Sequence, residues 1–441
     1  MRVAFVVGAF PVLSQTFVLN QITGLLDLGL EVDIYSQRLG DRGSQVHPDV
    51  LEYNLLERTR YFFPEKSQNL FSKVARVTKN FAAICLAKPT WTLRAVQCCL
   101  REGSLAPISL FRQLIDAPAY DVIQCHFGYT APIGIVFKEL GLAQKVIVTF
   151  HAHELTNKLT PRQAKLYRQW SEDIDLLTPV SYLWKESLAE MGCPPQKILV
   201  HRMAVDMDRF EFRVRKPGPS LRLLTVARLV EKKGIEYAIR AVSIIQESHP
   251  HIDVSLNIVG DGELRSSLES LRISLGLEDS VHFLGWLDQD EVRQEMRAAD
   301  VFVLPSVTAA DGGKEGVPVS LMEAMASGIP VVSTTHSGIP ELVEDGVSGY
   351  LVGEHDVAAL AHRICQFVDT PKLAETMGRA GRAFVDRNYN IATLNQRLSW
   401  IYTQLLQNEP LIDFERANAL KIAEPEPPSD RVTGLGEAPA A

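Results

Sequence analysis

Residues 301–341 read VFVLPSVTAADGGKEGVPVSLMEAMASGIPVVSTTHSGIPE, and this stretch decides the fold. Val301–Leu304 is a short apolar run, which is typical of a buried parallel strand. Pro318 favours a helix start, Val319–Ala326 carries apolar residues at helical spacing, and Ile329–Thr334 has the pattern of the next strand. The stretch therefore predicts a β–α–β unit with a long, glycine-rich loop at the carboxyl end of its first strand. Ligands of open parallel sheets bind at that edge, and anions bind at helix N-termini.

Two carboxylates of this stretch, Glu315 in the loop and Glu323 in the helix, have two interpretations. They are ordinary solvated charges, as most carboxylates are, or they contact a ligand. Glu323 lies between Met322 and Ala324 in a helix that the sheet should largely bury, and a buried carboxylate needs partners. Beside a phosphate site those partners are neutral hydroxyl groups, such as the paired hydroxyls of a sugar. The pattern favours a ligand that carries both sugar and phosphate.

A family resemblance rests on residues 315–332, EGVPVSLMEAMASGIPVV. This string, with its Glu-x7-Glu spacing, resembles the signature of retaining glycosyltransferases of family 4. The resemblance extends over about residues 1–405. It implies an α/β chain with the GT-B fold, in which two Rossmann-like domains face each other across a cleft and a C-terminal helix crosses back to the first domain.

The resemblance and the local composition together predict the domain boundaries. We expect an acceptor-binding domain at 1–210 with a basic helical insertion at 57–116, a nucleotide-sugar-binding domain at 221–385, a crossover helix at 386–407 and a disordered tail at 408–441. The linker between the domains is Arg213–Ser220, RVRKPGPS, because proline, glycine and charge gather there.

Basic residues follow the predicted strand Leu221–Val226, at Arg228 and Lys233. The resemblance implies that these two side chains bind the donor diphosphate, and cations beside the cleft would stabilise the charge that develops as a diphosphate leaves. The alternative is that both are surface charges, and Lys232 is predicted to be one. The resemblance also implies that Glu315 holds hydroxyls of the transferred sugar and that Glu323 holds those of the ribose. The implied donor-binding residues are Arg228, Lys233, Gly260, Gly313, Glu315, Gly316, Val317, Pro318, Val319, Ser320, Leu321 and Glu323.

Histidines stand at the ends of two successive predicted strands, Asp121–Phe127 and Lys145–Phe150. Because the carboxyl ends of parallel strands share one edge, we expect His126 and His151 to point into the cleft. The resemblance implies that His151 approaches the donor sugar. His151 and His153 could instead bind a metal, but no further ligand stands at metal-site spacing, so we expect no metal ion and no other cofactor. The predicted catalytic residues are His151, Glu315, Arg228 and Lys233.

The loop after the first predicted strand, Val3–Val7, continues into FPVLSQTF at residues 10–17. It resembles the FPxxSETF opening of exopolysaccharide-type members of the family, with Gln15 in place of the commoner glutamate. A plain turn after the first strand is an equally good interpretation. The implied acceptor-side residues are Ser14, Gln15, Thr16 and His126.

Residues 57–116 are basic, although the whole chain has a net charge of −8. They contain ten Lys and Arg against four Asp and Glu, with aromatic and aliphatic residues between them. Basic amphipathic helices can lie on an anionic membrane, or they can pack as a hairpin on the sheet with their charges in water. The sequence leaves both interpretations open.

The composition argues against several classes of protein. A net charge of −8 argues against nucleic acid as the partner, and six cysteines without a CxxC pair indicate a reducing cytosol. No apolar stretch approaches the ~20 residues of a membrane-spanning helix. We expect a cytoplasmic protein, located at the inner face of the cell membrane if residues 57–116 bind lipid.

The predicted function is retaining transfer of a sugar from a UDP- or GDP-sugar to a glycan or polyprenyl-linked oligosaccharide acceptor, in bacterial exopolysaccharide or other cell-surface polysaccharide synthesis. Two alternatives stay open. One is another reaction of this fold, such as sugar-nucleotide epimerisation. The other is a non-catalytic sugar-nucleotide sensor, which slow hydrolysis of the donor would exclude.

Overall fold

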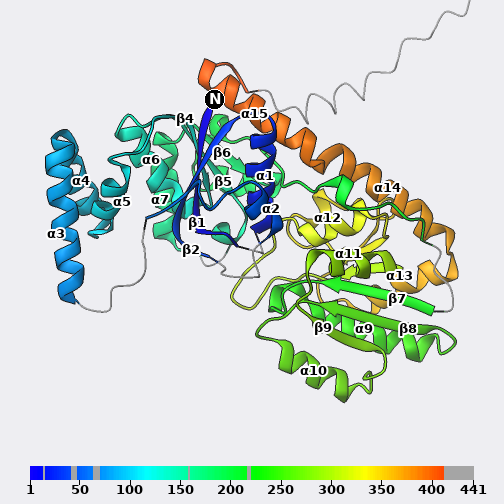
Figure 1. Cartoon of the computed structure of the whole chain (residues 1–441). Helices are drawn as coiled ribbons and strands as arrows, with labels where there is room; N and C mark the ends of the chain where they lie inside the picture. The colour runs from blue at the N-terminus through cyan, green and yellow to red at the C-terminus, as the bar shows by residue number, and fades with distance from the viewer. Residues whose placement is uncertain (13–14, 41–46, 63–69, 157–158, 216–219, 412–441) are drawn as a thin grey trace, which may run out of the picture.

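The computed structural model describes residues 1–12, 15–40, 47–62, 70–156, 159–215 and 220–411, and within them the strands form two separate six-stranded sheets. Neighbouring strands are parallel throughout both sheets. Figure 1 shows the two sheets in two bodies, each with its own helices. These are two Rossmann-like domains, so the predicted α/β GT-B fold is confirmed.

The first sheet has the order β3-β2-β1-β4-β5-β6. Side chains of β1 alternate between two apolar clusters, with Phe5 in one and Val6 in the other, as a sheet covered on both faces requires. Its strands are β1 (Arg2–Phe10), β2 (Glu31–Leu39), β3 (Thr59–Tyr61), β4 (Tyr120–His126), β5 (Ala143–Phe150) and β6 (Leu176–Pro179). Its helices are α1 (Thr16–Asp27), α2 (Pro48–Glu52), α3 (Leu70–Ala87), α4 (Pro89–Glu102), α5 (Ala106–Leu114), α6 (Ala131–Glu139), α7 (Pro161–Asp173) and α8 (Tyr182–Glu190).

The second sheet has the order β12-β11-β10-β7-β8-β9. The helix after its first strand, α9 (Ile235–Ser248), buries Ala238, Ile239 and Val242, which recur at helical spacing. Its strands are β7 (Ser220–Val226), β8 (Asp253–Val259), β9 (Val281–Gly285), β10 (Val301–Leu304), β11 (Val331–Thr334) and β12 (Tyr350–Val352). Its helices are α9 (Ile235–Ser248), α10 (Arg265–Ser274), α11 (Gln289–Ala298), α12 (Val319–Ala326), α13 (Val357–Asp369) and α14 (Lys372–Tyr389).

The strand order reverses once in each sheet, between β1 and β4 and between β7 and β10. Ligands of open α/β sheets bind beyond the carboxyl ends of the strands at such a reversal. The end of β10 leads into the loop that carries Glu315, and the end of β7 leads to Arg228 and Lys233. The fold therefore places both predicted donor-binding segments at the switch point of the second sheet.

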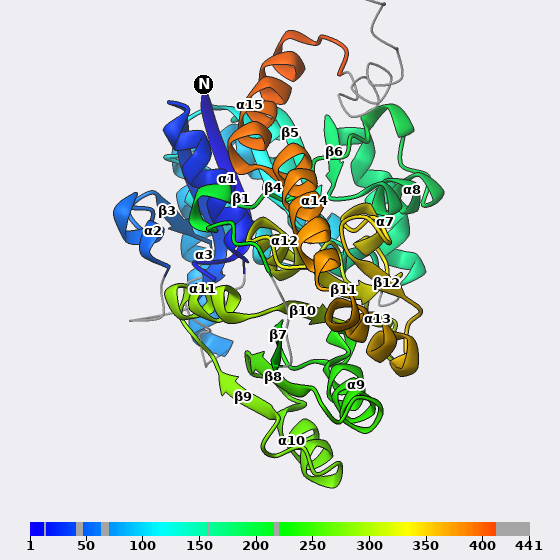
Figure 2. The ribbon, with the colours of Figure 1, turned by 90° about the vertical axis from the view of Figure 1, so that its right-hand side faces the viewer.

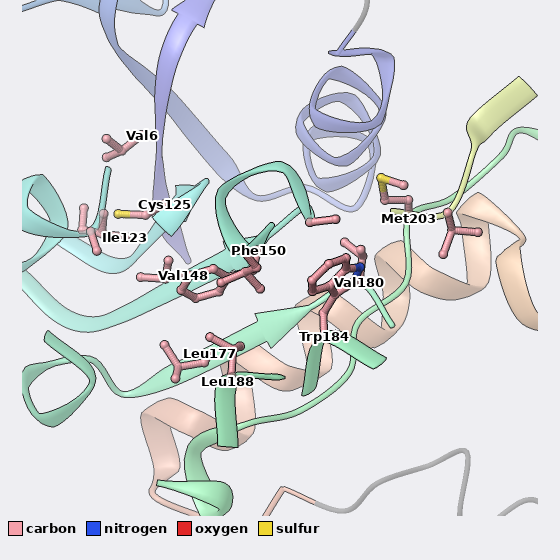
Figure 3. Close-up of a cluster of buried hydrophobic side chains, with 14 of the residues drawn as sticks. Val6, Ile123, Cys125, Val148, Phe150, Leu177, Val180, Trp184, Leu188 and Met203 are labelled. Carbon is pink, nitrogen blue, oxygen red and sulfur yellow. The ribbon is translucent and has the colours of Figure 1, made fainter. Parts of the chain in front are cut away.

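A well-packed apolar cluster lies beneath the ends of β4, β5 and β6 (Figure 3). Close packing of this kind leaves the strand ends little freedom to move. The residues labelled there are Val6, Ile123, Cys125, Val148, Phe150, Leu177, Val180, Trp184, Leu188 and Met203.

The C-terminal helix α15 (Ile391–Gln407) crosses back to the first domain, as predicted, but it begins at Ile391 and not at 386, because Asn390 separates it from α14. Figure 2 shows α14 and α15 in succession along one side of the molecule. α14 packs on α12, and α15 packs on α1 with Leu398 and Tyr402 in the first-domain core. At the crossing, the backbone N–H of Val205 donates to the carbonyl of Tyr389 at 2.9 Å, and the N–H of Ile391 donates to the carbonyl of Val205 at 3.0 Å.

The two domains also meet through a carboxylate. Glu341, in the 3-10 turn η8 (Ile339–Glu341), accepts the backbone N–H groups of Tyr182 and Leu183, both at 2.9 Å. These are the first residues of α8, so a side chain of the second domain caps a helix of the first.

Residues 57–116 are not purely helical, which corrects that part of the domain prediction. Thr59–Tyr61 forms β3, an edge strand paired with β2, because threonine and tyrosine suit a pleated edge. α4 and α5 bury Trp91 and Phe111 against the first domain, while Leu93 and Leu100 are exposed. In Figure 1, α3 and α4 lie at the outer edge of the first domain, away from the second.

None of the helices in the described part of the chain is long and apolar enough to span a bilayer. The predicted tail falls outside the described residues from 412 onward.

Candidate active site

A tight turn after β7 brings two lysines to the loop that follows β10. The turn is η7 (Glu231–Lys233), and Gly234 ends it with a φ of +61°. A Cβ atom on Gly234 would lie 1.9 Å from the carbonyl oxygen of Pro305, so only glycine allows this approach. The turn therefore sits directly against the end of β10.

Glu315 is the centre of the resulting charge cluster. Its side chain is 7% exposed, Lys233 Nζ donates to its Oε2 at 2.9 Å, and Lys232 Nζ forms an ion pair with its Oε1 at 3.1 Å. Burial alone would raise the pKa of Glu315, but the two lysines outweigh it and lower that pKa to about 2. The carboxylate is therefore ionised at every physiological pH. The prediction that Lys232 is a plain surface charge is wrong, because its side chain is only 20% exposed and faces Glu315.

The backbone of Glu315 is held by residues that the sequence analysis missed. Its N–H donates to His336 Nε2 at 3.0 Å, and its carbonyl accepts from Ser337 Oγ at 2.6 Å. Because His336 Nε2 accepts, Nδ1 carries the ring proton and donates to Glu354 Oε1 at 2.6 Å. The only available signal was position, since His336 and Glu354 each stand two residues beyond a strand end, where ligand-binding residues gather.

The helix α12 follows this loop and begins without a side-chain cap. An uncapped helix start presents free backbone N–H groups to an anion. The predicted segment Gly316–Leu321 forms this start, with Pro318 at the cap position.

Glu323, on α12, lines a cavity of about 180 Å³ between the domains. Thr16 lines the cavity from the first domain, and Leu287 and Arg293 line it from the second. Burial raises the pKa of Glu323 to about 7, and Arg293 only partly opposes this effect. His47 and Gln289 meet across the same cavity, with 2.7 Å between their Nε2 atoms.

The two predicted histidines form a buried pair at the ends of β4 and β5. His126 Nδ1 and His151 Nε2 lie 3.0 Å apart in hydrogen-bond contact, and the rings stack. Burial lowers the pKa of His126 to about 3 and lowers that of His151 well below its ordinary value, so both rings are neutral at pH 7. His126 is fully buried and contacts His151, which is 8% exposed. His153 has its side chain outside the described part of the structure.

The loop of the second domain contacts the histidine turn of the first at Gly316. A Cβ atom on Gly316 would lie 3.1 Å from the carbonyl oxygen of His151 and 3.4 Å from the Cβ of Ala152. Glu315, Lys233 and His151 are therefore brought to one place, although they come from three separate parts of the chain.

The other predicted residues surround this centre less tightly. Arg228 is exposed, and its guanidinium has no hydrogen bond or ion pair within the described residues. Gly260 packs against Ala227, beside Arg228, and Gly313 donates its N–H to Asp311. On the acceptor side, Gln15 precedes α1 and Thr16 begins it, whereas Ser14 lies outside the described residues.

In the part of the chain that the structure describes, no three His, Cys, Asp or Glu side chains gather in a way that could hold a metal ion.

Comparison with known families gives two matches that together span most of the chain. Residues 14–209 match the family described as "Glycosyltransferase Family 4", and residues 206–384 match "Glycosyl transferases group 1".

Individual proteins are similar over nearly their whole length. WcaL of Escherichia coli (strain K12), named for a glycosyltransferase role in colanic acid biosynthesis, is 40% identical over 90% of this chain and 98% of its own. "Amylovoran biosynthesis glycosyltransferase AmsK" of Erwinia amylovora is 36% identical over 92% of this chain and all of its own. A more distant Escherichia coli protein, "UDP-Gal:alpha-D-GlcNAc-diphosphoundecaprenol alpha-1,3-galactosyltransferase", is 26% identical over 68% of this chain and 80% of its own.

Among solved structures, Anabaena Alr3699/HepE in complex with UDP superposes with a TM-score of 0.68 at 18% identity. The match covers 92% of this chain and all of that one, and it supports the fold.

Proposed function

Because this chain belongs to glycosyltransferase family 4 and is itself a glycosyltransferase, we propose that its cleft moves a sugar from a UDP- or GDP-sugar to a glycan acceptor, with retention at the anomeric carbon and without a metal ion. The observation that carries this proposal is the meeting of the Glu315 loop with the His151 turn. Gly316, next to the Glu315–Lys233 ion pair of one domain, lies against the backbone of His151, which belongs to the neutral histidine pair of the other domain.

In this proposal the donor diphosphate lies at the start of α12. Backbone N–H groups of Gly316–Leu321 bind its oxygens, and Arg228 and Lys233 neutralise its charge. Lys233 has three N–H donors, so it can bind phosphate and Glu315 together. Gly313 and Gly260 allow the backbone to approach, and Glu323 accepts from the ribose hydroxyls beside the interdomain cavity.

No side chain is required as a nucleophile. Glu315 and His151 orient the sugar, while the departing phosphate oxygen takes the proton of the attacking acceptor hydroxyl. The positive groups at α12 stabilise the charge that collects on the diphosphate as its bond to the anomeric carbon breaks. The acceptor enters past Ser14, Gln15 and Thr16 from the first domain, on the side where His126 supports His151.

The acceptor class is proposed from the relatives. Two are named for colanic acid and amylovoran biosynthesis, and a more distant one is named for transfer to a diphosphoundecaprenol-linked sugar. We propose a polyprenyl-linked oligosaccharide of bacterial exopolysaccharide or other surface polysaccharide synthesis as the acceptor, used at the cytoplasmic face of the membrane.

The test is a panel of UDP-, GDP- and ADP-sugars in a thermal-shift assay, followed by incubation of each binder with the chain in EDTA. One UDP- or GDP-sugar is expected to raise the melting temperature and to undergo slow hydrolysis without acceptor. Hydrolysis that keeps the anomeric configuration supports retention. Binding without any hydrolysis would instead favour a sensor, and loss of turnover in EDTA that added metal restores would contradict metal independence.

The basic region adds a proposal about location, namely contact with an anionic bilayer. Leu93, Val96 and Leu100 recur at helical spacing on one exposed face of α4, and the neighbouring leucines Leu86, near the end of α3, and Leu105, directly before α5, are also exposed. Arginines and lysines flank this apolar face in a region of net positive charge. An apolar stripe bordered by cations suits the boundary between acyl chains and anionic headgroups.

Replacement of Leu86, Leu93 and Leu100 by serine is expected to weaken co-sedimentation with phosphatidylglycerol vesicles at least about tenfold, because the inserted apolar surface is lost. Binding of the parent chain is expected to fall with added salt. The matched control replaces Leu28, Leu51 and Leu56, which are exposed leucines of the same domain outside this surface. Equal vesicle binding by both triple variants would contradict the proposed surface.

A further inference from the structure

The carboxylate of Glu154, a half-buried side chain, joins the ends of two neighbouring strands in the first domain. Glu154 Oε1 accepts the backbone N–H of Gly128 at 3.2 Å and the backbone N–H of His151 at 3.0 Å. Gly128 lies two residues beyond β4, and His151 lies directly beyond β5. A single side chain therefore ties the two turns that carry the histidine pair.

Both turns contain a residue in a conformation that L-amino acids rarely adopt. Phe127 has a φ of +70°, and Ala152 has a φ of +81° with a ψ of −47°. Neither is glycine, so each backbone persists only where its surroundings hold it. Glu154 accepts hydrogen bonds from the residue after Phe127 and from the residue before Ala152. Its carboxylate therefore stabilises both unusual backbone conformations.

These turns determine where His151 lies relative to the second domain. Phe127 packs on the His151 ring with 4.7 Å between ring centroids, and Gly316 of the opposite loop fits against the carbonyl of His151. A shift of either turn would displace the imidazole pair and also the surface on which the Glu315 loop rests. Small displacements of this kind are costly when reacting groups must be aligned.

We propose that Glu154 is a positioning residue for sugar transfer, whose carboxylate holds the two strand-end turns and thereby orients His151 toward the bound donor. This role rests on the function proposed above, because it assigns Glu154 to the geometry of that reaction. It is not a catalytic residue, since the hydrogen bonds that it accepts from Gly128 and His151 come from backbone N–H groups of the protein.

The carboxylate holds the turns more strongly when it is ionised, because hydrogen bonds to a charged acceptor are the stronger ones. Burial raises the pKa of Glu154 to about 7, and its three backbone N–H contacts only partly oppose this effect. The titratable groups that face it are the phenols of Tyr129 and Tyr167, and Arg38 acts on Tyr129. Both phenols stay neutral near pH 7, since burial raises their pKa values. Protonation of Glu154 as the pH falls through about 7 is therefore expected to loosen both turns.

The experiment compares the full-length chain with Glu154→Gln, Glu154→Ala and the exposed control Glu186→Gln. In the parent and the control, kcat is expected to fall as the pH drops through about 7. Glu154→Gln keeps an acceptor oxygen without a titration, so its kcat should lose that inflection. Glu154→Ala should lose about tenfold in kcat at all pH values with little change in donor KM, which is less than the ~100-fold that misalignment by an ångström can cost.

A readout that does not depend on transfer separates this proposal from the proposed function. The imidazole ¹⁵N resonances of His126 and His151, recorded without donor, should shift in the parent near pH 7 although both rings stay neutral there, and they should not shift in Glu154→Gln. If these shifts appear but no donor is ever turned over, the proposed function fails and the positioning by Glu154 stands. An unchanged pH profile in Glu154→Gln together with unshifted imidazole signals in the parent would overturn the positioning role.

Discussion

Replacement of Glu315 by glutamine is expected to lower kcat at least about 100-fold, which is the scale of losing one preorganised charged group. Glutamine keeps the size of the side chain but removes the charge that neutralises Lys232 and Lys233. Both ammonium groups then lose their counter-ion beside the start of α12, and an amide accepts the hydroxyl donors of a sugar more weakly than a carboxylate does. Initial rates at saturating donor measure the effect, with the exposed Glu278→Gln as the matched control.

The same variant has a signature in stability that checks the charge cluster itself. The lysines hold the folded-state pKa of Glu315 at about 2, below its ordinary value of 4.5, in spite of burial. The ion pairs therefore contribute stability above pH 4.5, and this contribution is lost as the pH falls toward 2. The difference in the free energy of unfolding between parent and Glu315→Gln should narrow over that range in urea titrations. A folded variant with parental kcat would show that Glu315 does not act on the donor.

Replacement of Arg228 by alanine is expected to lower kcat/KM for the donor about 100-fold while changing the free energy of unfolding by no more than about 0.5 kcal/mol. The two effects separate because the guanidinium is exposed and forms no hydrogen bond or ion pair within the described residues, so the fold loses nothing with it. The bound diphosphate, in contrast, loses a cation at the end of β7. Steady-state kinetics with the donor identified by thermal shift, together with urea unfolding, measure both quantities.

Two further substitutions sharpen this test. Arg228→Lys keeps the charge but loses the planar pair of donors, so an intermediate rate is expected if the contact to phosphate is bidentate. Arg240→Ala removes an exposed arginine that pairs with Glu236 on the same helix, and it should match the parent. Parental kcat/KM in Arg228→Ala would remove this residue from the donor site.

The elements that the sequence predicted well are those with strong local signals. Val301–Leu304 and Val319–Ala326 have the predicted bounds, because an apolar run and a helical periodicity are properties of consecutive residues. The family resemblance then supplied the pairing of the two domains and the return of the last helix. Neither of these long-range features follows from periodicity.

The parts of the site that the sequence did not predict depend on contacts between distant segments. Lys232 and Lys233 are adjacent in the sequence, and no local sequence pattern indicates that the 3-10 turn directs both side chains toward Glu315. His336 and Glu354 support the backbone of Glu315 from two later strand ends, which requires the register of β10, β11 and β12. These supports are tertiary, so residue spacing alone could not reveal them.

The sequence did not indicate the proposed role of Glu154 for a different reason. Positive backbone torsions at Phe127 and Ala152 break the usual preference for glycine, and only the folded chain reveals them. The same holds for β3, since the short edge strand Thr59–Tyr61 stands next to a long helical region whose pattern dominates the local signal.

The hydrogen bonds of Val205 with Tyr389 and Ile391 restrict how the two domains can move relative to each other during turnover. They hold the end of the first domain against the segment by which the chain returns to that domain. The two stretches of chain that connect the domains therefore share one pivot. The domains can then rotate about this pivot while both hydrogen bonds stay intact. The walls of the cleft separate more, the farther they lie from the pivot. Sliding one domain past the other would break both bonds, so release of the spent nucleotide is expected to follow a swinging motion, not a shearing one.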